Sequence, residues 1–165
     1  MPFTPFHLGP ALLFGLLLYQ YLDLPTFLVS NIIIDIEPFI ILTRGLPIPL
    51  HGPFHSYTMS ALVSLVTALV MLLVKPVTRP VATLFRLRQE SSPLRIFATA
   101  LLGIYFHVTL DAFLYPEMGL MYPLESNPLL GLVSINSVYF FCTLCLPLGF
   151  ALYIYRLLEG FRRQK

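Results

Sequence analysis

Long apolar runs alternate with shorter polar segments along this chain. The runs that suit transmembrane helices are residues 8–22, 24–42, 57–74, 94–114 and 138–158. A helix needs roughly 20 apolar residues to cross a bilayer core of about 30 Å. The first run is shorter than this, and the others are close to it. The pattern therefore predicts an all-α integral membrane protein with about five transmembrane helices, built as a single domain over residues 1–165.

The composition agrees with a chain that turns much of its surface toward lipid. Of all residues, 57% are hydrophobic and only 11% are charged, whereas soluble domains carry about 25% charged residues. The net charge of +2 is too small to indicate a nucleic-acid partner. Membrane lipids are the partners that we expect, and the sequence does not indicate an oligomeric state.

The basic residues predict the orientation in the membrane. Nine of the ten lie either in the segment 75–95 or from Arg156 onward. Short loops rich in lysine and arginine stay on the cytoplasmic side. We therefore expect the N-terminus outside, the C-terminus inside, and a basic cytoplasmic tail over residues 159–165. The protein is predicted to be a multi-pass protein of the cytoplasmic (inner) membrane.

Two acids interrupt the second apolar run. Asp35 and Glu37 are followed directly by Pro38. Ionisable residues inside a membrane are costly and usually serve a function. Proline frees a backbone carbonyl one turn earlier and tends to kink a helix. This combination predicts an opened backbone that lines a cavity.

The predicted topology brings all four histidines and three of the eight acids to the same outer face. The converging residues are His7, Asp35, Glu37, His51, His55, His107 and Asp111. His107 and Asp111 are spaced i, i+4, which places them on one face of a helix. His51 and His55 have the same spacing but are separated by Pro53, so they fit either a loop or the first turn of the next helix.

Imidazole and carboxylate groups together favour zinc, manganese or iron over calcium. We predict a divalent metal site, most simply zinc, with the ligands His7, Asp35, His51, His55, His107 and Asp111. The number of candidates allows one ion or two. A metal-activated water would be the nucleophile, and either Asp35 or Glu37 would be the catalytic base.

Four further polar residues lie near this face, and three of them have two interpretations. Arg44 is a candidate substrate-binding residue for a phosphate, or an ordinary interfacial anchor. Ser56 is a second candidate for substrate binding, or the cap of the following helix. Glu117 and Glu125 are expected to be solvated loop acids, although Glu125 has a place in the sequence from which it can approach the site.

The order of these motifs resembles the LexA-regulated, YdjM-like inner-membrane proteins, a family described as metal-dependent hydrolases. The motifs are Thr4-Pro-Phe-His7, Asp35-Ile-Glu37, His51-Gly-Pro-Phe-His55-Ser56, His107-Val-Thr-Leu-Asp111 and Tyr122-Pro123-Leu124. Many members have an arginine and one extra residue between the two loop histidines, which this chain lacks, and Arg44 is the candidate to replace it. Many members also have aspartate at the position of Glu37. The resemblance implies a metal-dependent hydrolase.

Three functions fit these observations. The first is a hydrolase that acts at the outer membrane face on a lipid or lipid-linked ester or phosphoester. The second is a metal-binding membrane protein without enzymatic activity, either a transporter or a sensor. The third is a structural protein in which the acids and histidines form a buried hydrogen-bond network.

Overall fold

The chain folds into a bundle of helices, as its sequence predicts. A computed structural model describes residues 5–162, so residues 163–165 of the predicted basic tail lie outside the described part. Within it the elements are α1 (Pro5–Leu17), α2 (Leu24–Ile33), α3 (Ile36–Arg44), the 3₁₀ turn η1 (Pro53–His55), α4 (Tyr57–Leu84), α5 (Pro93–Ala112) and α6 (Ile135–Arg162).

Four helical segments among the described residues are long and apolar enough to cross a membrane. They are Leu24–Arg44, which joins α2 and α3, and Tyr57–Leu84, Pro93–Ala112 and Ile135–Glu159. The first predicted span is shorter than expected, because α1 ends at Leu17 and turns follow it. Its 13 residues extend only about 20 Å at 1.5 Å per residue. The prediction of about five spans is thus confirmed for four.

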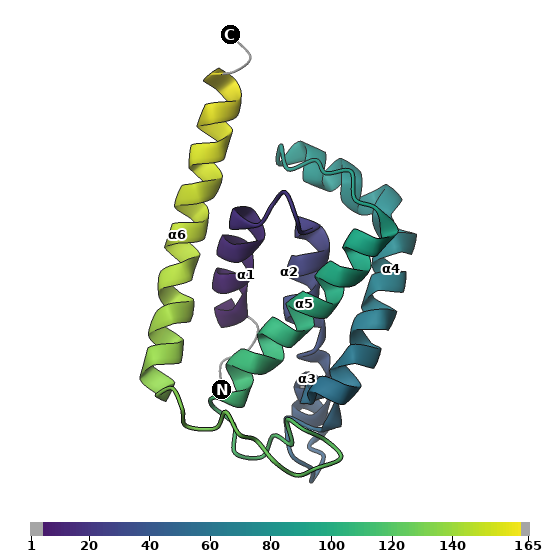
Figure 1. Ribbon diagram of the computed structural model, residues 1–165, viewed down its shortest axis with the longest axis vertical. Helices are drawn as coiled ribbons and strands as arrows, with labels where there is room; N and C mark the ends of the chain where they lie inside the picture. The colour runs from purple at the N-terminus through teal and green to yellow at the C-terminus, as the bar shows by residue number, and fades with distance from the viewer. Residues whose placement is uncertain (1–4, 163–165) are drawn as a thin grey trace.

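The arrangement separates two chemically different ends. Helix α1 packs against α6 and α2, and α5 packs against α4 and α2 (Figure 1). One end holds the start of α4, the end of α5 and the connections 45–56 and 113–134. The opposite end holds the turn at 18–23 and the connection 85–92 (Figure 1). The predicted basic segment and the histidine-rich segments consequently lie at opposite ends of the bundle.

Helix α4 is longer than the sequence reading predicted. Residues 75–84 were expected to form part of a loop but continue the helix, with Pro76 and Pro80 inside it. Figure 1 shows this last part of α4 turning sharply away from the main axis. Proline removes one hydrogen bond and bends a helix without always ending it. Pro76 and Pro80 therefore mark a bend within α4.

Two helix contacts depend on glycine. A Cβ at Gly9 in α1 would lie 2.4 Å from the Cys142 carbonyl oxygen in α6, and a Cβ at Gly103 in α5 would lie 2.6 Å from the Ser30 Cβ in α2. Small residues let helix backbones approach closely where no hydrophobic driving force operates between them. The second contact sets the spacing between α2 and α5, which both carry residues of the site described next.

The predicted opening beside Pro38 is present. Regular helix stops at Ile33 and resumes at Ile36. The Ile34 carbonyl accepts a hydrogen bond from the Glu37 N–H at 3.3 Å, because Pro38 has no N–H to offer at the helical position. The break carries Asp35 between two helices, where its side chain faces His107 of α5 and is 9% exposed.

Candidate metal centre

Segments far apart in the sequence bring all four histidines and two aspartates together. His7 comes from α1, Asp35 from the α2–α3 break, His51 and His55 from the connection before α4, and His107 and Asp111 from α5. All six residues are buried, none more than 7% exposed. The sequence prediction that these residues converge at one end of the bundle is therefore confirmed by their positions.

Asp111 lies at the centre of the cluster. Its Oδ2 atom is 3.0 Å from His107 Nε2 and 3.9 Å from both His51 Nε2 and His55 Nε2. Its Oδ1 atom is 3.2 Å from His7 Nε2. The four imidazoles thus present the same ring nitrogen to one carboxylate. Asp35 joins from the other side, with its Oδ1 atom 3.4 Å from His107 Nε2.

The opposite ring nitrogen of three histidines is held by a separate oxygen. His55 Nδ1 lies 2.9 Å from Glu37 Oε2, and His51 Nδ1 lies 3.0 Å from Glu117 Oε1. His107 Nδ1 lies 2.9 Å from the Asn31 backbone carbonyl. A proton on each Nδ1 satisfies these oxygens and leaves the Nε2 lone pair free. Metal-binding histidines are oriented in this way by carboxylates and carbonyls.

The donor atoms match the spacing that a metal ion requires. One ligand atom from each of Asp35, His55, His107 and Asp111 falls in a group whose members all lie within 4.8 Å of one another. Ligands that share a tetrahedral zinc at about 2.0–2.1 Å lie about 3.3 Å apart, close to the contacts around Asp111. Within residues 5–162, His55 Nε2, His107 Nε2 and Asp111 Oδ1 are buried without a hydrogen bond. The group can hold a metal ion.

The surroundings of His55 favour a neutral ring, and an aromatic neighbour holds the ring of His51 in place. Burial lowers the pKa of His55, although its hydrogen bond to Glu37 acts in the opposite direction. A neutral imidazole is the form that binds a metal. The His51 ring stacks on Tyr115, with the ring centroids 3.7 Å apart. Burial raises the pKa of Tyr115, so this neighbour stays an uncharged phenol.

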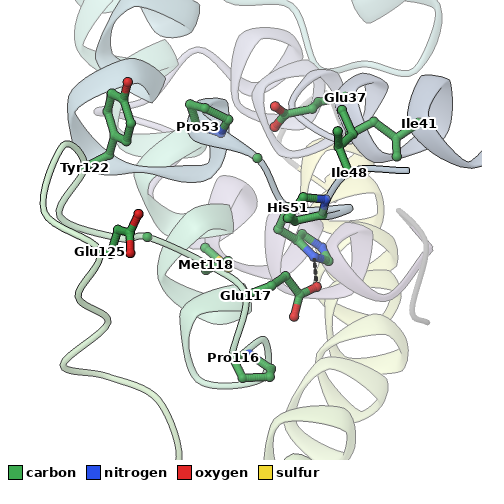
Figure 2. Close-up of a pocket in the computed structure, with 13 residues that line it drawn as sticks. Glu37, Ile41, Ile48, His51, Pro53, Pro116, Glu117, Met118, Tyr122 and Glu125 are labelled. Carbon is green, nitrogen blue, oxygen red and sulfur yellow. Dashed lines mark hydrogen bonds and ion pairs between the residues drawn. The ribbon is translucent and has the colours of Figure 1, made fainter. Parts of the chain in front are cut away.

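A cavity of about 550 Å³ opens beside the cluster. Figure 2 shows His51 on its wall, with its hydrogen bond to Glu117, and shows Glu37 beside Ile41 and Ile48. Glu125 and Tyr122 line another part of the wall (Figure 2). His51 belongs to both the cavity wall and the histidine cluster, and Glu37 in the same wall contacts His55. A substrate in the cavity would therefore lie next to a bound ion.

The two predicted substrate-binding residues lie outside this cavity wall. Arg44 is exposed at the last turn of α3. Ser56 is completely buried, donates a hydrogen bond to the Pro53 carbonyl and accepts one from the Met59 N–H. The alternative interpretation of Ser56 as the cap of α4 is the one that the structure confirms.

Two contributors to the cluster were not recognised in the sequence. Glu117 was expected to be a solvated loop acid but contacts His51, and Asn31 was given no role although its carbonyl holds His107. The Asn31 contact uses the backbone carbonyl, a group that every residue has, so the residue type at this position gave no signal for it. Glu117 gave no signal either, because the path of the 113–134 connection decides where it lies.

Comparison with protein-family models, curated proteins and solved structures gave no match. The family resemblance in the motifs therefore stays a prediction, and the function is argued from the site itself.

Proposed function

We propose that this protein is a membrane-embedded, metal-dependent hydrolase that acts on a lipid or lipid-linked ester or phosphoester. The observation that carries the proposal is the convergence of four histidine Nε2 atoms on Asp111, with three of the Nδ1 atoms held from behind. A buried hydrogen-bond network alone gives no reason for all four rings to present the same atom.

The protein residues have distinct roles in this proposal. His55, His107, Asp35 and Asp111 hold the ion, and His7 and His51 complete its surroundings or hold a second ion. Glu37 and Glu117 orient His55 and His51. Glu37 and Asp35 remain the candidates for the base. The Glu37 contact with His55 favours an orienting role for Glu37, whereas Asp35 belongs to the ligand group.

A divalent ion in such a site lowers the pKa of water and polarises a phosphoryl or carbonyl oxygen. In hydrolysis, the water oxygen bonds to the phosphorus or carbonyl carbon, and the bond from that atom to the leaving oxygen breaks. The proton from water ends on the leaving oxygen. The cavity beside His51 provides space for the group that is cleaved. Membrane-spanning helices around it support a substrate that arrives from the lipid phase.

The decisive experiment compares the metal content of the wild-type protein with that of Asp111→Asn, purified in mild detergent. Asparagine keeps the size of the side chain, and circular dichroism checks that the helices are retained. We expect near-stoichiometric zinc, manganese or iron in the wild type and at least a tenfold loss of metal affinity in the variant. Metal-dependent turnover of lipid esters or phosphoesters by the wild type alone would complete the test. A metal-free wild type from metal-supplemented cells would contradict the proposal.

Metal transport is the alternative that the geometry favours less. Transport sites usually lie near the middle of the membrane between structural repeats, whereas this cluster lies at one end of the bundle (Figure 1). Metal uptake into proteoliposomes by the wild type, with no hydrolysis of any lipid, would favour transport.

A further inference from the structure

The charges around the cavity do not suit a purely anionic substrate. Glu37, Glu117 and Glu125 line it, and within residues 5–162 no lysine or arginine does. Asp35 and Asp111 lie close behind. One divalent ion would neutralise two of these five carboxylates, and even a second ion would leave an excess of negative charge. A group that binds beside the ion in this cavity therefore gains from carrying a positive charge of its own.

A second, apolar groove of about 430 Å³ adjoins the cavity and shares three lining residues with it. It lies between α3 and the start of α4, and Ile36, Ile40, Phe54 and Val63 are among its lining residues. Glu37, Ile41 and Ile48 line both hollows, and Figure 2 shows these three side chains together at one side of the cavity. Among the described residues, Glu37 is the only ionisable one that lines the groove, so the surface changes from polar to apolar at this residue.

We propose that the two hollows together bind one phospholipid with an amine-bearing headgroup. A hydrocarbon chain lies in the groove, the phosphate lies toward the metal centre, and the ammonium group faces Glu117 and Glu125. The inference rests on the proposed function and narrows its substrate class from lipids in general to zwitterionic, amine-bearing phospholipids. An apolar groove that adjoins the cavity at Glu37, Ile41 and Ile48 argues for a lipid, and the excess of carboxylates argues for the amine.

The test is a native mass spectrometry titration of detergent-purified protein. The probes are phosphatidylethanolamine and phosphatidylglycerol with identical acyl chains, which differ in the charge of the headgroup. We expect the wild type to bind phosphatidylethanolamine several times more tightly than phosphatidylglycerol. Glu125→Gln should reduce this preference roughly threefold to fivefold, the range of one exposed ion pair. Glu159→Gln, which removes the same charge at the opposite end of the bundle, is the matched control and should leave the preference unchanged.

A second pair of variants tests the groove. Ile40 lines the groove and is 47% exposed, so a larger side chain can be accommodated without disturbing the core. Ile40→Trp should weaken binding of both lipids about tenfold, the equivalent of about two methylene groups excluded from an apolar site. Leu73→Trp, at a 79% exposed position of α4 outside the groove, is the control and should leave the binding of both lipids unchanged.

Equal or tighter binding of phosphatidylglycerol, or an unchanged preference in Glu125→Gln, would overturn the inference. Displacement of the lipid by chain-free glycerophosphoethanolamine, with no effect of Ile40→Trp, would also overturn it. Binding requires no turnover, so the outcome is separate from that of the proposed function. Hydrolysis of both lipids at equal rates by metal-loaded protein would leave the hydrolase proposal standing and the lipid preference refuted.

Discussion

At the residue scale, the main feature is a set of buried charges without a lysine or arginine among them. Asp35 and Asp111 are buried, and their close partners are histidines. Burying a carboxylate without compensation costs several kcal/mol. The compensation is therefore either a protonated histidine or a bound cation. The Nδ1 contacts of His51, His55 and His107 fit a bound cation, because a proton on each Nδ1 leaves the Nε2 lone pair available for the ion.

The residue-scale prediction concerns Glu37. Glu37→Gln keeps an oxygen that can accept the hydrogen bond from His55 Nδ1 but removes the charge behind the ring. We expect a tenfold to hundredfold loss of metal affinity, the range found when such partners are changed. Isothermal titration with zinc measures it. Glu125→Gln, in the wall of the same cavity, is the control and should retain wild-type affinity.

The opposite result would give Glu37 the role of catalytic base. If Glu37→Gln binds zinc with wild-type affinity but loses turnover, the carboxylate accepts the proton of the attacking water and does not serve to orient His55. Asp35 would then remain a ligand without a catalytic role of its own.

At the scale of elements, the site depends on how closely α2 and α5 approach. Asn31 and Asp35 come from α2 and its C-terminal break, and His107 and Asp111 come from α5. Gly103 lies one turn before His107 at the point of contact, where its Cα faces Ser30 and Phe27. Any increase in the distance between these helices would separate His107 Nδ1 from the Asn31 carbonyl.

The corresponding prediction is that Gly103→Ala destabilises the protein and weakens metal binding together. The new Cβ would lie 2.6 Å from the Ser30 Cβ and 3.2 Å from Phe27 Cδ2, and such overpacking costs about 1–3 kcal/mol. Thermal unfolding in detergent and zinc titration measure the two effects. Gly119→Ala is the control, because its Cβ would meet no atom closer than 3.8 Å. Wild-type stability of Gly103→Ala would show that the helix spacing adapts.

At the scale of the whole molecule, the two ends of the bundle differ in charge. Five of the eight acids and all four histidines lie at the end that holds the metal centre. The basic segment, which runs from the last turns of α4 to the start of α5, lies at the other end. There Arg79 and Arg88 pair with Glu90, and the Arg95 side chain donates to the Tyr19 and Leu22 carbonyls. Applied to the basic end, the positive-inside rule predicts that the metal centre faces the outer side of the membrane.

Cysteine labelling tests the predicted orientation. Leu124→Cys places a thiol at a 68% exposed position of the 113–134 connection, and Leu84→Cys places one at a 79% exposed position at the end of α4. A membrane-impermeant maleimide should label the first in intact cells and the second only after permeabilisation. The native Cys142 and Cys145 are buried, so the unsubstituted protein gives the background. The reverse pattern would place the metal centre on the cytoplasmic side.

The amino-acid sequence by itself determined the helical class, the approximate positions of the apolar helices and the break beside Pro38. These features depend on local properties: the length of apolar runs, and the missing N–H of one proline. It also identified six residues that meet at one end, since the alternation of spans and loops fixes which ends of the helices face the same way. The bend of α4 at Pro76 and Pro80 was misread as a loop, because a proline ends some helices and bends others.

Only the tertiary structure decided which atoms contact one another within the site. It places Asp111 at the centre, Glu37 and Glu117 against the Nδ1 atoms of two histidines, and Ser56 at the cap of α4. The contacts of Asp111, Glu37 and Glu117 depend on distances between segments that are remote in the sequence. The close approach of α2 and α5 at Gly103 and the path of the 113–134 connection set those distances. Sequence patterns report which side chains reach the same end of a bundle. Packing across the bundle decides which of their atoms face one another.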